Sequence, residues 1–350
     1  MVKSQNRYIL PSKKVGCSLL ELTIMAVEIT DEYIELLNKG VSREIQVSVQ
    51  YILQHAKAEE KLLRKIKQEN YLLEKTTYET IAKDLKEISI QEMKHAAKII
   101  ERIYYLGGKA TTKSSKVTVG ETLKEFAELD MKAEEEALVL YREVIEAARV
   151  IGDMETYDDF LDIYSDEEKH FFRFQELLTI DDSEPPENEP DSKRFREVFT
   201  DDYIEMLNKA VAAEICAIIQ YTNQHEKANW IALRKLETPL EVISDKTRAK
   251  VVSELLKKTF MVEMQHLEMI TERIYRNKFE CVSVPDPLPE IGETADDFLI
   301  LDHKAEDDAI MLYREIVEEA LKRGDTVTRR MFEKIIDDEE GHYWAFDDFF

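Results

Sequence analysis

Apolar residues recur at helical spacing along almost the whole chain, and the alternating pattern of a half-buried strand is hard to find. In the first half this pattern predicts four long helices, at about 31–68, 77–106, 120–150 and 153–178. Thr30 can cap the first helix, Gly107 can end the second, and Gly152 marks a tight turn between the third and fourth. We therefore predict an all-α protein.

The chain repeats itself at an offset of 170 to 172 residues. The segment 30–39 matches 200–209, and Leu140-Tyr141-Arg142-Glu143 recurs as Leu312-Tyr313-Arg314-Glu315. Self-similarity at a fixed offset indicates a duplicated structural unit. The expected organisation is an N-terminal extension at 1–29, a first four-helix bundle at 30–180, a linker at 181–198 and a second bundle at 199–350.

Each copy contains one longer segment that is poor in helical pattern, at 109–119 and at 277–291. A long connection between the second and third helices lets them run parallel, which gives a four-helix bundle with one crossover. Prolines and acids in the segment 181–190 suit an extended linker between the bundles. At 350 residues the chain is long enough for each domain to bury a core of its own.

The charge balance excludes one class of partner and favours another. The formal net charge is -25 and no cluster of Lys and Arg stands out, so we expect no nucleic-acid partner. An acidic surface attracts cations instead. No apolar run approaches the roughly 20 residues that span a bilayer, so we expect no membrane partner.

The cysteines and the N-terminal segment indicate the cellular compartment that we expect for this protein. Cys17, Cys216 and Cys281 form no CxxC motif and are odd in number, so free thiols in a reducing cytoplasm are the simpler interpretation. Basic residues before the mostly apolar segment 15–29 faintly resemble a signal peptide. Two glutamates interrupt that segment and no small-residue cleavage site follows, so an amphipathic extension is favoured.

Four of the seven histidines lie three residues after a glutamate, which on a helix places both side chains on one face. The pairs are Glu92/His95, Glu167/His170, Glu263/His266 and Glu339/His342. One such pair alone is more often a solvated helix face than a metal site. Each copy, however, also carries a glutamate near the middle of its first and third helices, namely Glu44, Glu134, Glu214 and Glu306. The complete pattern occurs twice, which favours metal ligation.

Four carboxylates and two imidazoles inside one bundle need compensating charge, because buried unpaired charges are costly. Two metal ions would supply it. Oxygen-rich ligation with some imidazole suits iron or manganese better than a thiolate-binding metal, and a carboxylate can bridge two ions. We therefore expect a two-metal centre in each bundle, of iron or, as an alternative, manganese.

These motifs resemble those of the bacterioferritin family of ferritin-like di-iron proteins. The similar stretches, which span about 300 residues, include Glu44 with Gln50-Tyr51, Glu92-Met93-Lys94-His95, Arg142-Glu143 and Asp338-Glu339-Glu340-Gly341-His342. The resemblance implies bridging roles for Glu92, Glu167, Glu263 and Glu339, terminal roles for Glu44, Glu134, Glu214 and Glu306, and one iron for each of His95, His170, His266 and His342. The implied activity is that of a ferroxidase, which oxidises Fe(II) with O2 or H2O2 for iron detoxification or storage.

For two further pairs of residues, the sequence leaves two possible roles open. Tyr51 and Tyr221 lie seven residues after the first-helix glutamate, where they either serve the centre by a hydrogen bond or an electron, or complete the core. Met93 and Met264 stand where bacterioferritins ligate haem between two subunits, so either the two repeats share a haem or both residues pack a helix interface. We expect self-association through bundle faces, within the chain or between chains.

The resemblance does not extend to every family feature. The inner-surface iron ligands of the family are replaced by Glu87, Gln91, Lys258 and Val262, and neither copy has residues for a short fifth helix. An alternative function is therefore a rubrerythrin-like peroxidase, or another di-iron oxidase, without mineral storage. Against rubrerythrin, no CxxC pair is present, and alanines occupy the position of its extra third-helix glutamate. A structural bundle is disfavoured, since neither copy has lost a ligand.

Overall fold

The computed structural model describes residues 29–65, 72–178, 198–234 and 243–350. Within these ranges it contains eight helices and no strand, which confirms the all-α prediction. The first half comprises α1 (Asp31–Lys65), α2 (Leu72–Tyr105), α3 (Leu123–Ile151) and α4 (Met154–Leu177). The second half comprises α6 (Asp201–Arg234), α7 (Ile243–Arg276), α8 (Ala295–Arg323) and α9 (Thr326–Asp347). None of the described helices is both long and apolar enough to cross a membrane.

The helix ends follow local capping chemistry. The side chain of Thr30 accepts a hydrogen bond from the N–H of Tyr33 at 3.2 Å, as predicted for the start of α1. Gly152 ends α3 with a φ of 81°, and Gly324 ends α8 with a φ of 71°, a conformation that glycine adopts without strain. The second helix begins at Leu72 rather than at about 77. The predicted end of the first helix near 68, the extension 1–28, Cys17 and the linker as far as 197 lie outside the described residues.

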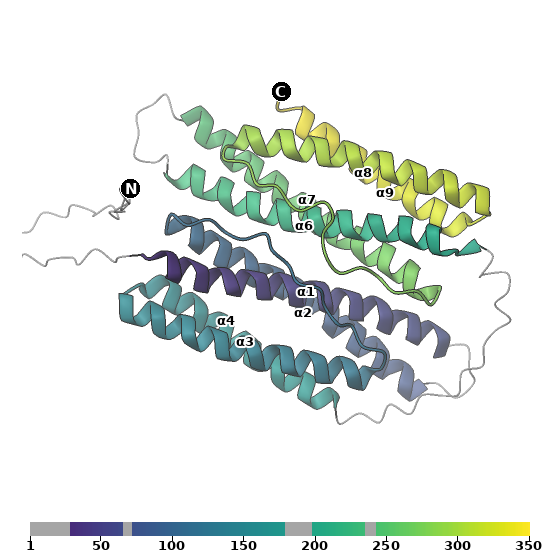
Figure 1. The fold of residues 1–350 in the computed structure, drawn as a ribbon, viewed down its shortest axis with the longest axis horizontal. Helices are drawn as coiled ribbons and strands as arrows, with labels where there is room; N and C mark the ends of the chain where they lie inside the picture. The colour runs from purple at the N-terminus through teal and green to yellow at the C-terminus, as the bar shows by residue number, and fades with distance from the viewer. Residues whose placement is uncertain (1–28, 66–71, 179–197, 235–242) are drawn as a thin grey trace, which may run out of the picture.

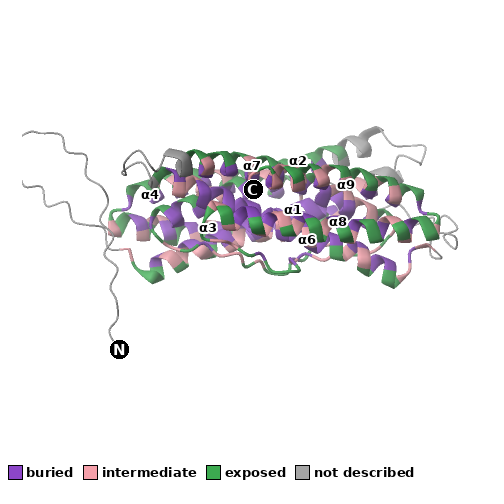
Figure 2. Ribbon diagram, turned by 90° about the horizontal axis from the view of Figure 1, so that it is seen from above, coloured by how far each residue is buried: buried purple, intermediate pink, exposed green. Residues whose placement is uncertain are grey.

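The eight helices form two four-helix halves that lie side by side (Figure 1). Helices α1 and α2 of the first half face α6 and α7 of the second, with α1 against α7 and α2 against α6. The pairs α3/α4 and α8/α9 cover the two outer sides. In Figure 2 the buried residues run through the middle of the assembly and the exposed ones cover its outside.

The apolar core does not stop at the boundary between the halves. One continuous cluster of buried side chains includes Ile45 and Ile99 from the first half and Ile215 and Ile270 from the second. The prediction of a separate core for each domain is therefore wrong in this respect. The cause is the shared surface of α1, α2, α6 and α7, which buries apolar side chains from both halves.

The crossover of each half is a non-helical segment, at 106–122 and at 277–294, as the sequence predicts. In each half, an asparagine on the first helix forms hydrogen bonds with the backbone of the crossover segment. Asn38 accepts the N–H of Thr111 at 2.7 Å, and Asn208 accepts the N–H of Val282 at 2.8 Å. The two crossovers also meet each other, since Val117 N–H donates to Ser283 Oγ at 3.1 Å.

Candidate metal centres

Six candidate ligands of the first half come together in its interior, contributed by all four of its helices. They form two overlapping sets, the first made of Glu44, Glu92, His95 and Glu167, and the second of Glu92, Glu134, Glu167 and His170. In each set one donor atom from every residue lies within 4.8 Å of the others. All six residues are buried. Glu92 and Glu167 belong to both sets, which is the arrangement of carboxylates that bridge two ions.

The imidazole rings turn the same nitrogen toward the shared carboxylates. His95 Nδ1 lies 3.1 Å from Glu92 Oε2 and 2.9 Å from Glu167 Oε1. His170 Nδ1 lies 2.9 Å from Glu92 Oε1 and 3.5 Å from Glu167 Oε2. Each ring nitrogen therefore faces both shared carboxylates across one small space between α2 and α4.

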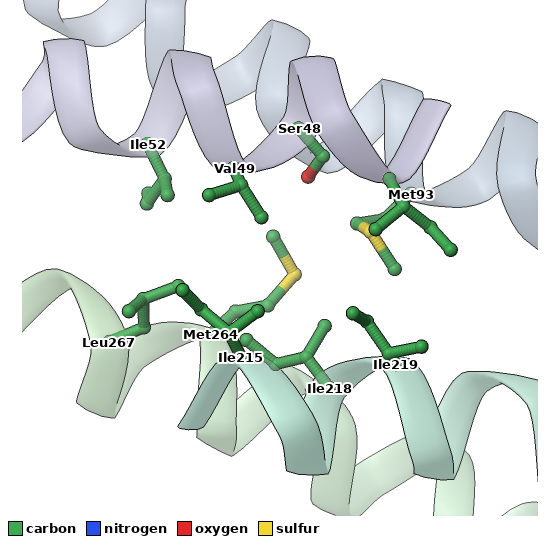
Figure 3. Close-up of a pocket in the computed structure, with 10 residues that line it drawn as sticks. Ser48, Val49, Ile52, Met93, Ile215, Ile218, Ile219, Met264 and Leu267 are labelled. Carbon is green, nitrogen blue, oxygen red and sulfur yellow. The ribbon is translucent and has the colours of Figure 1, made fainter. Parts of the chain in front are cut away.

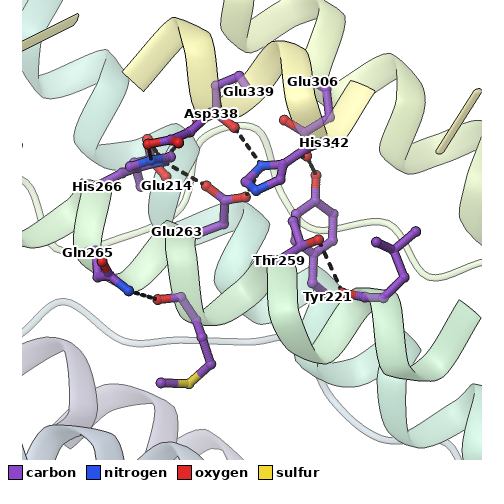
Figure 4. A network of polar contacts seen from close by, with 12 residues as sticks. Glu214, Tyr221, Thr259, Glu263, Gln265, His266, Glu306, Asp338, Glu339 and His342 are labelled. Carbon is purple, nitrogen blue, oxygen red and sulfur yellow. Dashed lines mark hydrogen bonds and ion pairs between the residues drawn. The ribbon is translucent and has the colours of Figure 1, made fainter. Parts of the chain in front are cut away.

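The second half repeats this arrangement with near-equal distances (Figure 4). Its two sets are Glu214, Glu263, His266 and Glu339, and Glu263, Glu306, Glu339 and His342. His266 Nδ1 lies 3.0 Å from Glu263 and 3.1 Å from Glu339. His342 Nδ1 lies 3.0 Å from each of the same two carboxylates. All twelve residues that the sequence singles out as ligands thus fall into two clusters of six.

Each carboxylate outside the shared pair accepts a hydrogen bond from a tyrosine of another helix. In the first half Tyr51 of α1 donates to Glu134 of α3, and Tyr141 of α3 donates to Glu44 of α1. The second half repeats both bonds, with Tyr221 donating to Glu306 at 2.7 Å and Tyr313 donating to Glu214 at 2.6 Å. Sequence reasoning found Tyr51 and Tyr221 but missed Tyr141 and Tyr313. The signal was present, because Tyr141 also lies seven residues after a ligand glutamate.

A second class of missed residues lies behind one imidazole of each cluster. His95 Nε2 faces Asp166 Oδ2 at 3.5 Å, and His266 Nε2 faces Asp338 Oδ2 at 3.4 Å. A carboxylate on the outer ring nitrogen fixes the orientation of a histidine ligand. These aspartates begin the Asp-Glu-Glu-x-His motifs of α4 and α9, which was the available sequence signal.

In the first half, the pKa shifts of the shared carboxylates differ in direction from those of the other two carboxylates. Burial, with the charges of Glu167 and Glu92, raises the pKa of both Glu44 and Glu134 well above the usual value. Burial also opposes ionisation of Glu92, but hydrogen bonds from the two imidazoles outweigh it and lower its pKa. Hydrogen bonds to the shared carboxylates outweigh burial at the rings as well, and raise the pKa of His95 to about 11 and that of His170 to about 9.

The ligand set of each cluster fits two divalent cations. Four ionised carboxylates and two neutral imidazoles carry four negative charges, which two divalent ions balance. Because metal ligands must be deprotonated, metal binding to this cluster releases protons. The buried Oε2 atoms of Glu44 and Glu134 have no hydrogen-bond partner, which leaves them free as ligand atoms. This oxygen-rich donor set suits iron or manganese.

The two methionines meet between the halves. Met93 and Met264 line the same apolar cavity, together with residues such as Ile45, Val49 and Ile215 (Figure 3). The cavity has a volume of only about 10 Å³, whereas pockets for organic ligands measure roughly 300–1,000 Å³. Haem does not fit this packing. The geometry agrees with the alternative interpretation, in which both methionines fill a helix interface.

Comparisons with known proteins agree with this architecture. The ferritin-like domain family matches residues 34–182 and again 204–350. A bacterioferritin of Desulfovibrio desulfuricans is 30% identical over 145 residues, which are 41% of this chain and 73% of that protein. A bacterioferritin of Rhodobacter capsulatus is 34% identical over 141 residues, which are 40% of this chain and 76% of that protein.

A solved structure of Rhodobacter capsulatus bacterioferritin, described with a metal-free dinuclear site and a haem iron, is 30% identical. It covers 43% of this chain and 86% of its own, with a TM-score of 0.37. The two family matches lie on the two halves of the fold, one on each set of four helices. The chain therefore belongs to the ferritin-like family, as a tandem duplication of the bacterioferritin-type domain.

Proposed function

We propose that each half binds two iron ions and oxidises Fe(II), which makes the chain a tandem ferroxidase. One observation carries the proposal: both halves bring together the same four glutamates and two histidines, all of them buried except the partly buried His342, with the histidine nitrogens facing two shared carboxylates. A cluster of this composition would be costly to bury without cations. Both copies of it are complete.

The proposed role of each side chain follows from its position in the cluster. Glu92 and Glu167 bridge the ions, and His95 and His170 each bind one of them. Glu44 and Glu134 are terminal ligands, which the tyrosines hold in place and which lose a proton when the metal enters. The second half uses the corresponding residues, with Glu263 and Glu339 as bridges, Glu214 and Glu306 as terminal ligands, and His266 and His342 as nitrogen ligands.

Fe(II) is the substrate in this proposal, and the oxidant is O2 or H2O2. Two Fe(II) ions give up two electrons, which with two protons reduce O2 to H2O2, or reduce H2O2 to two molecules of water. The iron pair supplies the electrons when bound, and the carboxylates balance the added positive charge. Free Cys216 and Cys281 agree with a reducing cytoplasm as the site of action. No nucleic-acid or membrane partner is part of the proposal.

Iron loading tests the proposal directly. The metal-free protein is loaded anaerobically with Fe(II) and then given O2 or H2O2, while bound iron, Fe(III) absorbance and oxidant consumption are measured. We expect saturation at about two irons per half, followed by rapid oxidation. The variant Glu92→Ala with Glu263→Ala should lose both. Oxidation at the wild-type rate in that variant, or none in the wild type, would refute the assignment.

The same experiment with excess iron separates storage from catalysis without storage. Glu87 and Lys258, two of the residues that replace the family's inner-surface ligands, are exposed in this structure. We propose that oxidation serves detoxification and that no large mineral core forms. Particle size by light scattering should stay constant as iron is added, whereas growth of dense particles would establish storage.

A further inference from the structure

A third group of metal-binding side chains lies outside the two four-helix centres. It consists of His55 on α1 of the first half and of Glu268 and Glu272 on α7 of the second half. One donor atom of each lies within 4.8 Å of the others. The two glutamates are one helical turn apart and so share a face of α7. The group thus spans the contact between the two halves.

The histidine of this group is oriented as a ligand. Its ring is buried, and its Nδ1 lies 2.7 Å from the carbonyl oxygen of Ala82. A carbonyl oxygen can only accept, so Nδ1 carries a hydrogen, and Nε2 is the ring nitrogen that a metal ion can bind. That nitrogen lies 3.0 Å from Glu268 Oε1. Two donors that each bind one tetrahedral ion at ~2.1 Å are separated by about 3.4 Å, so little movement is needed.

We propose that His55, Glu268 and Glu272 bind a single divalent first-row transition-metal ion between the two halves. One imidazole and two carboxylates match the ligands that zinc, iron and manganese take in proteins. Three protein ligands leave at least one position for water, and the two glutamates are only partly buried, so an ion can reach the site from solvent.

Two positively charged side chains, those of Lys86 and Arg276, already contact the glutamates of this group. Lys86 Nζ lies 2.8 Å from Oε1 and 2.7 Å from Oε2 of Glu268. Its side chain is 40% exposed, so it can swing into water when a divalent ion arrives. The other cation, Arg276, binds Glu272 Oε2 at 2.6 Å, which leaves Oε1 of that carboxylate for the ion. Lys86 is therefore a competitor of the metal rather than part of its site.

The duplication provides a matched control. The counterpart of His55 is His225, whose Nδ1 likewise faces a carbonyl oxygen, that of Ser253, at 2.7 Å. The counterpart of Glu268, however, is Ala97, so this second position lacks the central carboxylate. Among the described residues, the group around His225 does not bring three donors together. The third site is therefore expected once per chain.

Zinc is a suitable probe because it is redox-inert and accepts both kinds of ligand. Bound zinc per chain is counted by equilibrium dialysis for the full-length metal-free protein and its variants. The proposal requires that His55→Ala and Glu272→Gln each lose one zinc ion per chain, while His225→Ala binds as many as the wild type. Since Glu272→Gln keeps the shape of its side chain, it decides the result if His55→Ala fails to fold.

Lys86→Met separates a metal site from a simple ion pair. Removal of a competing cation should tighten zinc binding at this site several-fold, and anomalous scattering at the zinc edge should locate an ion between His55 and the two glutamates. The proposal is wrong if His55→Ala and Glu272→Gln bind as much zinc as the wild type. It is also wrong if Lys86→Met lowers the melting temperature without changing the affinity for zinc.

Discussion

At the scale of single residues, one tyrosine hydroxyl holds each carboxylate outside the shared pair. Tyr141 and Tyr313 donate to Glu44 and Glu214, and both hydroxyl groups are fully buried. Supporting groups of this kind typically contribute 10- to 100-fold to metal affinity. We therefore expect Tyr141→Phe with Tyr313→Phe to bind Fe(II) about 10- to 100-fold more weakly in an anaerobic titration, with the helical content of the wild type.

The matching pair Tyr51→Phe and Tyr221→Phe separates the two roles left open for these tyrosines. If they only hold Glu134 and Glu306, this variant should weaken Fe(II) binding as the first pair does and oxidise bound iron at the wild-type rate. If they also donate an electron, oxidation of preloaded iron should slow in a single-turnover experiment. Unchanged affinity in both pairs would contradict a supporting role for the hydroxyl groups.

One residue makes the two centres electrostatically different. Arg43 lies beside the first centre, where its positive charge opposes the raised pKa of Glu134, and its buried Nε and Nη2 have no hydrogen-bond partner. The corresponding residue of the second half is Ala213. A nearby cation weakens the binding of another cation. The first centre should therefore bind Fe(II) more weakly than the second.

Exchange of these residues tests that difference. Arg43→Met should tighten binding at the first centre by about tenfold, equivalent to about 1.4 kcal/mol. A two-phase calorimetric titration of the metal-free protein should then approach a single phase. The reciprocal variant Ala213→Arg should weaken the second centre. Two centres of equal affinity in the wild type would contradict the argument.

A buried acid behind the centre makes stability depend on pH. Burial raises the pKa of Asp130 to about 8, although Gln50 donates to it at 2.8 Å. In the unfolded chain an aspartate has a pKa of about 3.9, so between these values the native state binds more protons. Stability should therefore fall as pH rises from about 4 to 8, by up to about 1.4 kcal/mol per unit. Below this window Asp130 is protonated in both the native and the unfolded state and no longer makes stability depend on pH.

The variant Asp130→Asn removes that titration while keeping the shape of the side chain. Urea unfolding of the metal-free protein at pH 5, 6, 7 and 8 should show a shallower decline than in the wild type. Asp302, the counterpart in the second half, also has a pKa raised by burial, so the double variant should flatten the profile further. If the free energy of unfolding falls with pH equally steeply in the wild type and the variants, groups other than Asp130 and Asp302 cause the pH dependence.

At the scale of elements, the crossover of each half depends on one asparagine. Asn38 Nδ2 donates to the carbonyl of Lys109 at 3.0 Å while its Oδ1 accepts from Thr111, and Asn208 makes the equivalent pair of bonds. These bonds are exposed or only partly buried, and a typical hydrogen bond contributes a net stabilisation of roughly 0.5–1.5 kcal/mol. Asn208→Ala should lower the free energy of unfolding by that amount and increase the rate of hydrogen exchange at the amide of Val282. If the exchange rate at Val282 does not increase, contacts other than those of Asn208 hold the crossover segment in place.

Helices and ligands were predictable from the sequence because both depend on spacing within one helix. Glu92 and His95, for example, are neighbours on any helix, and the duplication repeats the observation. The tyrosine bonds were harder to predict, since Tyr141 and its acceptor Glu44 lie on different helices. The contact of His55 with Glu268 joins two halves and has no repeated counterpart. A pattern that occurs once and spans distant segments leaves no periodic signal in the sequence.

At the scale of the whole molecule, the surface shared by the halves is closely packed around the two methionines. Met93 and Met264 face each other across the surface where α1 and α2 meet α6 and α7 (Figure 3). Ile45, Ile215 and Leu267 fill the remaining space. Insertion of haem would separate these packed apolar side chains, and the macrocycle would have to replace the dispersion attraction between them. In this structure the two halves pack directly against each other at this surface.

We accordingly expect protein from haem-replete expression to lack a stoichiometric Soret band. Met93→Leu with Met264→Leu should keep the thermal stability of the wild type within about 1.5 kcal/mol, because such a change nearly conserves volume. Met93→Ala with Met264→Ala leaves a larger cavity at the same place and should cost roughly 2–5 kcal/mol per site. A Soret band in the wild type that disappears in the leucine variant would show instead that the halves open to bind haem. The relative stabilities of the two variants therefore test whether these methionines act as packing groups.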